Sequence, residues 1–247
     1  MSRAEIHHSF YLLGTVALAV AMPLSHFVMG LSAFLLLLNW VAEWNWREKW
    51  SRLKDNRQGI LIAAFYLVYA VGLIRVTDWG AAGGEMLGKL PFLFAPLVVI
   101  TSKPFSPKES QAIFTAFVLA TLFGCVWNFI YAETHTLGDY REMSRFIDHI
   151  RFGLCVVMSV VFCIHFFLNM AQDRAIRYVY LIVSVIIVLY LIYSQTLSGI
   201  LTLMAVAFCF ITHLIANRTN RRTKWLLGGI TATLLAAVVA YRSEEHT

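Results

Sequence analysis

The fold class follows from residues 150–170, which read IRFGLCVVMSVVFCIHFFLNM. A bilayer core about 30 Å thick is crossed by a helix of roughly 20 apolar residues, and this stretch has that length and composition. Its one Lys, Arg, Asp or Glu is Arg151, next to the polar pair Asp148 and His149. The stretch therefore predicts a transmembrane helix with an arginine at its mouth.

Composition extends this prediction to the rest of the chain. The 247 residues are 59% hydrophobic and 14% charged, with a mean hydropathy of +0.69. We predict an all-α, polytopic integral membrane protein with a single transmembrane domain over residues 1–247 and about nine helices. The nine expected crossings are residues 10–22, 27–42, 60–74, 90–101, 112–131, 150–170, 178–194, 197–216 and 225–240. Pro23 should end the first, and Pro91 and Pro96 bracket the short fourth.

Charge placement predicts the orientation, because Lys and Arg concentrate on the cytoplasmic side. With the N-terminus inside and nine crossings, 14 of the 20 Lys and Arg residues lie inside. The inner parts then carry a net +8 and the outer parts a net −2. The C-terminus is expected outside. Removing one crossing between the third and the eighth would put the basic clusters 47–57 and 218–224 on opposite faces, so the short fourth segment is kept.

Several classes of protein are disfavoured by the same residues. The net charge of +6 comes from short loops beside apolar helices, as topology alone requires, so no nucleic-acid partner is expected. The four cysteines lie inside predicted helices without ligand-like spacing, which predicts packing roles and neither a disulfide framework nor a metal site. They are Cys125, Cys155, Cys163 and Cys209.

The two chain ends give two further expectations. No small-residue cleavage site follows the first apolar run, so this run is interpreted as an uncleaved first helix. After the ninth crossing the sequence ends within seven residues, at YRSEEHT. This ending is interpreted as the start of an outer loop, so the chain is expected to be the N-terminal portion of a longer protein.

The loops and the sparse intramembrane polar residues have structural interpretations. Residues 44–58 are basic and contain Trp44, Trp46 and Trp50, which is typical of an interfacial belt on the inner surface. Asn128 and Thr202 fall inside predicted crossings, and Thr196 lies at an outer turn; interhelical hydrogen bonding is the expected role of such residues.

Arg151 comes with charged neighbours and is therefore a candidate for function. Arginine near hydrocarbon is costly unless it snorkels to the headgroups, pairs with an acid such as Asp148, or holds an anionic ligand. Arg141, Arg145 and His149 precede it in the same outer loop, and Arg75 and Lys89 belong to another. The guanidinium fork holds phosphate bidentately, so the expected ligand is a lipid-linked pyrophosphate. Histidine at this mouth could act as a general base toward a sugar hydroxyl.

Three stretches resemble a known family, the bacterial O-antigen ligase and polymerase proteins, in particular a branch from Bacteroidetes-type bacteria. The first is LLNW at residues 37–40, followed by a basic loop. The second is KLPFLFAPL at residues 89–97, with SKP at 102–104. The third is DYRE at residues 139–142, leading to HIRFGL at 149–154. The order and spacing are similar along nearly the whole chain.

The resemblance implies a GT-C-like, metal-independent glycosyltransferase without a cofactor. Such a protein transfers a glycan from undecaprenyl pyrophosphate at the periplasmic face of the bacterial inner membrane. Ligases pass the glycan to lipid A-core, and polymerases pass it to another lipid-linked glycan. The family's catalytic histidine and a further arginine lie in a loop after the ninth helix. The catalytic residues are therefore expected beyond Thr247, while Arg151 matches a pyrophosphate contact, with His149, Arg145 and Arg141 beside it.

One departure and two rival classes remain. Relatives often read Ser-Arg-Thr-Gly or Ser-Arg-Gly at the outer start of the eighth helix, whereas this chain reads TLSG at residues 196–199. A transporter or flippase for a lipid-linked or anionic solute would also use outer arginines and proline-broken helices, but no second copy of the broken segments occurs late in the chain. A non-catalytic membrane scaffold would tolerate leucine or lysine at Arg151.

Overall fold

The described part of the chain is helical, with no strand, in the computed structural model. The structure describes residues 2–56, 91–136, 140–169 and 174–218, and the single positions 64, 66, 68, 71, 72, 79, 80 and 83. Its elements are α1 (Arg3–Leu24), α2 (His26–Ala42), α3 (Trp46–Asp55), α6 (Pro91–Thr101), α7 (Pro107–Thr134), the 3-10 helix η2 (Tyr140–Met143), α8 (His149–Asn169), α9 (Arg174–Tyr193) and α10 (Leu197–Arg218).

Serine caps fix where three of these helices begin. Ser2 and Glu5 form a reciprocal capping box at the start of α1, and Ser106 and Glu109 form another at the start of α7. Ser25 ends α1 and also caps α2, since its hydroxyl accepts a hydrogen bond from the Val28 amide at 3.3 Å. The first helix thus begins earlier than its apolar run and passes through Pro23 to Leu24, so the expectation that Pro23 ends it was wrong by one residue.

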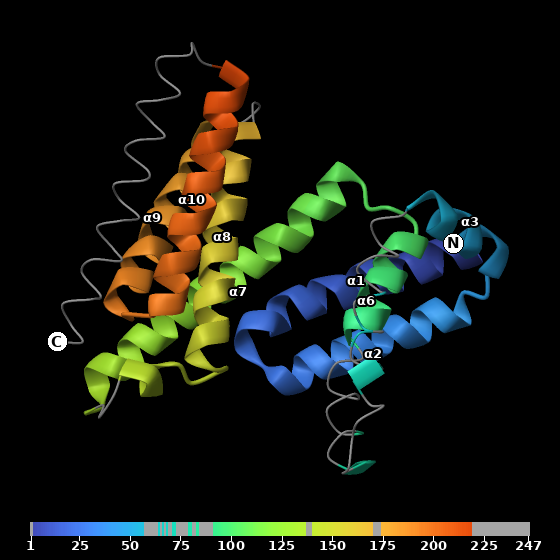
Figure 1. The fold of residues 1–247 in the computed structure, drawn as a ribbon, viewed down its shortest axis with the longest axis horizontal. Coiled ribbons are helices and arrows are strands. Elements are labelled where there is room, and N and C mark those ends of the chain that lie inside the picture. Colours follow the sequence, from blue (N-terminus) through green and yellow to red (C-terminus); the bar gives the residue numbers. More distant parts are fainter. Residues whose placement is uncertain are drawn as a thin grey trace.

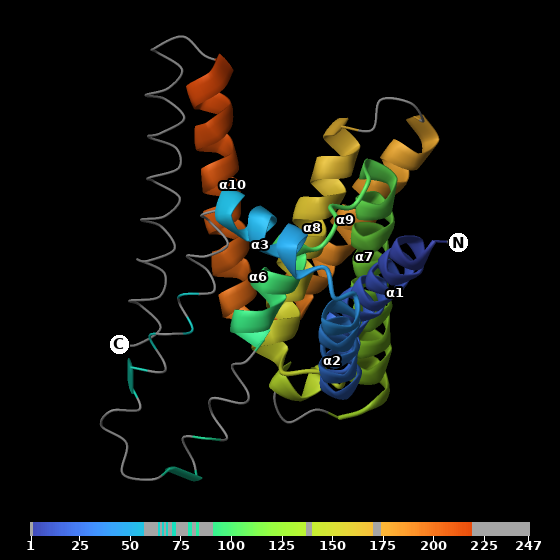
Figure 2. The same ribbon diagram turned by 90° about the vertical axis from the view of Figure 1, so that its right-hand side faces the viewer.

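The long helix α7 connects two groups of helices. The α1–α2 hairpin packs on one part of α7, and α8, α9 and α10 pack together at the other (Figure 1). The helix α3 leaves α2 at 113° and reaches the end of α6 (Figure 2). The start of α1 and the start of α7 lie near α3. This end of the helices is opposite the α7–α8 connection.

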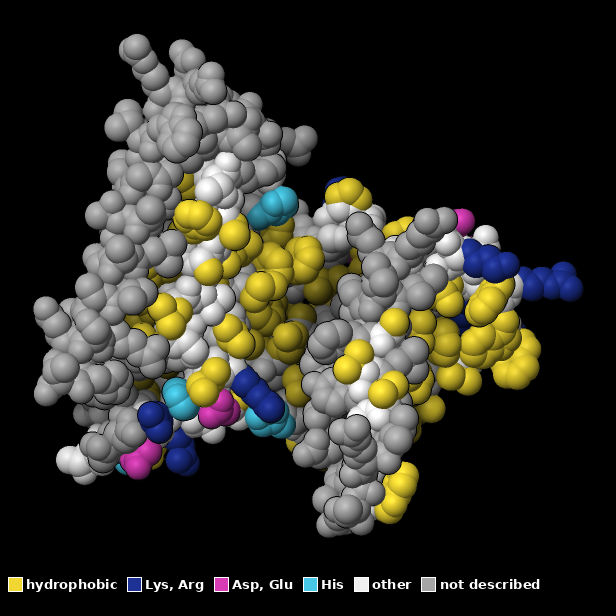
Figure 3. Space-filling model, in the orientation of Figure 1, with side chains coloured by type: hydrophobic (Ala, Val, Ile, Leu, Met, Phe, Trp, Pro, Cys, Tyr) yellow, Lys and Arg dark blue, Asp and Glu magenta, His cyan; other side chains and the backbone are white. Residues whose placement is uncertain are grey.

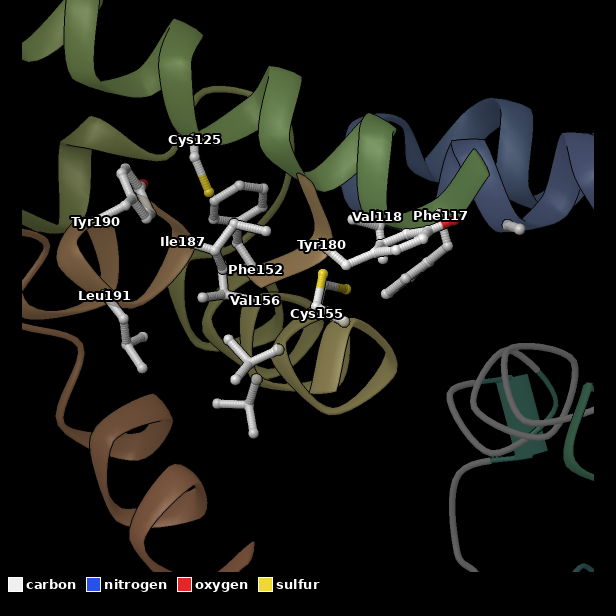
Figure 4. Packing of buried hydrophobic residues seen from close by; sticks show 14 of the residues in the cluster. Phe117, Val118, Cys125, Phe152, Cys155, Val156, Tyr180, Ile187, Tyr190 and Leu191 are labelled. Carbon is white, nitrogen blue, oxygen red and sulfur yellow. The ribbon is translucent and has the colours of Figure 1, made fainter. Parts of the chain in front are cut away.

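The core lies among α7, α8 and α9. Figure 4 shows side chains of these three helices pointing toward one another, and Val156, Cys163 and Ile187 are fully buried. Cys125 and Cys155 belong to the same cluster, so three of the four cysteines are packing residues, as predicted. Outside this core the helices expose large apolar side chains, for example Leu189 and Ile192 at 61% each. An apolar exterior of this kind is suited to hydrocarbon and not to water.

The chain is accordingly a membrane-embedded helical protein. Within the described residues, four helices have the length and composition to cross a bilayer, namely α1, α7, α8 and α9, and the bent pair α2 and α3 would make a fifth span. The predicted eighth crossing corresponds to α10, whose apolar part is the shorter Leu197–Thr212. The predicted fourth corresponds to α6, which at 1.5 Å per residue is only about 16 Å long. The ninth crossing and ten of the fifteen residues of the third lie outside the described residues.

Candidate functional site

The connection between α7 and α8 carries the predicted site residues and is anchored to the helices. Met143 and Ile147 are buried at 2% and 6% exposure and belong to the main core. The Ser144 hydroxyl donates a hydrogen bond to the Ile147 carbonyl at 2.7 Å, which closes a tight loop between the two. Buried apolar anchors of this kind hold the polar residues between them in one arrangement.

Asn128 gives this connection a second, polar anchor. The residue is fully buried near the end of α7. Its side-chain amide donates to the Tyr190 hydroxyl of α9, and its carbonyl oxygen accepts from the Arg145 backbone amide, both at 3.3 Å. The predicted role of Asn128 in interhelical hydrogen bonding is therefore confirmed. The structure adds that the same side chain also positions the loop.

A polar hollow of about 580 Å³ opens over this loop, and we call it the outer hollow. It is lined by His26, Arg141, Glu142, Ser144, Arg145, Phe146, Ile147, Asp148 and His149. The Arg145 guanidinium lies 4.8 Å from the centre of the Tyr131 ring, a distance at which the cation is attracted to the ring face. His149 Nδ1 lies 3.4 Å from Asp148 Oδ1, so protonation of this histidine would form an ion pair.

Three of the four predicted pyrophosphate contacts, Arg141, Arg145 and His149, thus line one hollow. Arg151 does not line it. At about 100° per residue, two residues place Arg151 on the face of α8 opposite His149. Arg151 is exposed and makes no hydrogen bond or ion pair with any residue that the structure describes. Arg75 and Lys89 lie outside the described residues.

The face that carries Arg151 continues into an apolar groove. The offsets of three, seven and eleven residues put Leu154, Met158 and Phe162 on the same stripe of α8. These three side chains line a groove of about 280 Å³ between α1, α7 and α8. Its other lining residues, Thr15, Leu18, Ala19, Met22, Ile113, Phe114, Phe117 and Cys155, are nearly all apolar. Arg151 is not among the lining residues and lies about one turn before Leu154 on the same face of α8.

The outer hollow and the apolar groove are lined by different faces of α8, and both reach the turn between α1 and α2. Met22 lines the groove and His26 lines the hollow, while on α8 Leu154 lines the groove and His149 the hollow. Figure 3 shows the apolar depression between the two groups of helices, with basic, acidic and histidine side chains gathered at its lower edge. A polar, partly cationic hollow near an apolar groove is suited to bind an amphiphile with an anionic headgroup.

Comparison with known proteins adds no family to this geometry: no family model, curated protein or solved structure matches the chain.

Two parts of the site were missing from the sequence prediction. His26 follows Ser25 in the turn between the first two crossings, so the predicted topology placed it on the same side as Arg141 and Arg145. The apolar groove had a signal in the spacing of Leu154, Met158 and Phe162 after Arg151, because these positions share a helix face. Its opposite wall on α1 and α7 depends on tertiary packing and leaves no such signal.

Proposed function

We propose that the protein is a glycosyltransferase of the O-antigen ligase type. It would take a glycan from undecaprenyl pyrophosphate at the periplasmic face of the bacterial inner membrane and pass it to lipid A-core. The observation that carries the proposal is the outer hollow, with Arg141, Arg145 and His149, near an apolar groove whose lining on α8 begins one turn after Arg151. A polyprenyl pyrophosphate has a matching division into a phosphorylated head and a hydrocarbon tail.

In the proposed reaction an acceptor hydroxyl attacks the anomeric carbon of the glycan. The carbon–oxygen bond to the pyrophosphate breaks, the leaving pyrophosphate keeps the electron pair, and the hydroxyl proton passes to a base. Arginine side chains in a partly dehydrated site stabilise the negative charge that builds up on the departing diphosphate. Among the three arginines Arg141, Arg145 and Arg151, Arg145 is the best positioned to stabilise this charge. Its guanidinium lies over the Tyr131 ring, and its backbone amide donates to Asn128.

An O-antigen polymerase would use the same donor site with a second lipid-linked glycan as acceptor. The other alternative is a transporter or flippase for a lipid-linked or anionic solute. The sharp bend between α2 and α3 and Pro96 inside α6 favour it, because broken helices are common in transporters. A flippase moves the donor lipid intact, whereas a glycosyltransferase releases undecaprenyl pyrophosphate without its glycan, so the products separate the two classes.

The test is glycan transfer from undecaprenyl pyrophosphate by the full-length protein in liposomes, with Arg151→Lys as the variant. Lysine keeps the charge but loses the bidentate fork, so we expect transfer to fall about tenfold. Arg47→Lys is the matched control, since Arg47 is an exposed arginine of α3 at the opposite end of the helices. Near-normal transfer by Arg151→Lys would contradict the proposed contact between Arg151 and the pyrophosphate. Translocation of intact donor without transfer would favour the flippase.

A further inference from the structure

A second polar pocket lies at the opposite end of the helices, about 150 Å³ in volume, and we call it the N-terminal pocket. It is lined by Ala4, His7, His8, Tyr11, Asn39, Glu43, Asn45, Glu48, Arg52, Ser102 and Lys103. Residues of α1, α2, α3 and the α6–α7 connection meet there. The pocket is independent of the proposed transfer site, with which it shares no residue.

Most charges of this pocket are already paired within the protein. Glu43 pairs with the buried Lys49 at 3.0 Å, and Glu48 pairs with Arg52. Arg52 also donates to the Thr101 carbonyl at 3.1 Å. In contrast, Lys103 is exposed and makes no hydrogen bond or ion pair with a described residue. The unpaired charge that the described pocket offers a ligand is thus an ammonium group, which selects for an anion.

Two histidines of the pocket each have one ring nitrogen committed to the protein. His8 Nε2 lies 2.9 Å from Glu109 Oε1, and a carboxylate only accepts, so this nitrogen carries the proton. His7 Nδ1 lies 2.8 Å from Asn39 Oδ1, while the Asn39 amide donates to the His7 carbonyl at 3.0 Å. An imidazole that donates through one ring nitrogen only keeps the other nitrogen as an acceptor.

Of the two remaining acceptor nitrogens, that of His8 is the more costly to leave without a hydrogen bond. His8 Nδ1 is buried and has no hydrogen-bond partner among the described residues. A buried acceptor without a partner is costly, and a ligand with a hydroxyl donor would satisfy it. The N-terminal pocket is therefore suited to a ligand that carries both a negative charge and a free hydroxyl group.

The neighbouring helix places the pocket at the level of lipid headgroups. Trp44 and Trp50 are 70% and 60% exposed beside α3, and tryptophan concentrates at the membrane–water interface. Arg47 and Lys54 on the same helix add positive charge, which attracts anionic lipids to the surface. The pocket opens between this helix and the starts of α1 and α7, so a phospholipid headgroup at this level can reach it.

We propose that the N-terminal pocket binds a phosphoglycerol group, as carried by phosphatidylglycerol. The ammonium of Lys103 contacts the phosphate, and the glycerol hydroxyl donates to His8 Nδ1. The shared chemistry, a phosphate ester with a free hydroxyl, is also present in free glycerol phosphate.

The experiment measures lipid affinity of the purified full chain by native mass spectrometry. Phosphatidylglycerol is compared with phosphatidylmethanol, which has the same charge and no hydroxyl. We expect phosphatidylglycerol to bind about fivefold more tightly, and His8→Phe to abolish this preference. Equal binding of the two lipids by the unaltered protein would overturn the proposal. Glu109→Gln, which keeps His8, should retain the preference, and loss of the preference in that variant alone would contradict the role given to His8.

Charge recognition is tested with a matched pair of lysines. Lys103→Met should weaken phosphatidylglycerol binding about tenfold. Lys108→Met removes an exposed charge from the first turn of α7, outside the pocket, and should leave the affinity unchanged. An equal loss in both variants would show surface attraction without a site and would overturn the proposal. Competition by free glycerol phosphate at low concentration would identify the soluble ester, and not the lipid, as the source of the group.

Discussion

Asn128 shows how a single buried side chain can organise the outer hollow. It connects α7 to Tyr190 of α9 and to the backbone of Arg145. Its polar atoms lie where water is excluded, so each lost partner leaves a buried group unsatisfied. The position of Arg145 therefore depends on a residue that does not itself line the hollow.

Replacing Asn128 by alanine should lower the free energy of unfolding by about 1–3 kcal/mol, because the Tyr190 hydroxyl and the Arg145 amide both lose their partner. Thermal unfolding in detergent measures the effect. Thr121→Val is the control, since Thr121 is equally buried and its hydroxyl bonds to the Phe117 carbonyl of its own helix. A loss no greater than that of the control would contradict the role given to Asn128.

The helices α8 and α10 approach each other closely at Gly153 and Gly199. A Cβ atom on Gly153 would lie 2.8 Å from the Thr196 side chain and 3.6 Å from the Cα atom of Gly199. Small residues allow such crossings in membrane proteins, where close packing replaces the hydrophobic driving force. The TLSG stretch at residues 196–199 has no arginine, unlike the motif of the family that the sequence resembles, and its Gly199 serves the packing of α10 on α8.

Gly153→Val should separate α10 from α8 and destabilise the protein by about 1–3 kcal/mol through overpacking. The matched control is Gly30→Val in α2, because a Cβ atom on Gly30 would meet nothing within 4 Å. The melting temperatures of the two variants in detergent compare them directly. Similar melting temperatures would mean that the α8–α10 contact contributes little.

The sequence predicted the apolar parts of the helices better than their ends. The expected crossings 112–131, 150–170 and 178–194 fall on Pro107–Thr134, His149–Asn169 and Arg174–Tyr193. Apolar runs mark what lies in hydrocarbon, whereas polar caps such as Ser106 and Glu109 extend a helix beyond it. The bend before α3 depends on loop conformation and three-dimensional packing, which hydropathy does not encode. The opposite facing of His149 and Arg151 follows from helix geometry once α8 is known to begin at His149.

For the complete fold, the arrangement of ends agrees with the predicted sidedness. Arg3, Arg52 and Lys103 lie near one another through contacts of α1, α2, α3 and α6, and the α7–α8 connection lies at the other end. These basic residues of three separate segments therefore lie at one end of the helices, as the charge distribution requires. Which side faces the cytoplasm remains a prediction from charge.

Single cysteines test this orientation in intact cells. With the exposed native Cys209 replaced by serine, Ser51→Cys should react with a membrane-impermeant thiol reagent only after permeabilisation, and Thr136→Cys should react without it. Both positions are exposed, Ser51 in α3 and Thr136 after α7. The reverse pattern would place the outer hollow in the cytoplasm and would exclude a periplasmic reaction.

The most direct measurement is photo-crosslinking with undecaprenyl pyrophosphate that carries a diazirine in its hydrocarbon chain. The lipid should attach to Leu154, Met158 and Phe162 of α8 and to Phe114 and Phe117 of α7, which line the apolar groove. Arg145→Met and Arg151→Met should each reduce attachment there, because the head loses a phosphate contact. Attachment spread evenly over exposed lipid-facing residues such as Leu189 and Ile192, and unchanged in both variants, would contradict a donor-lipid site between α1, α7 and α8.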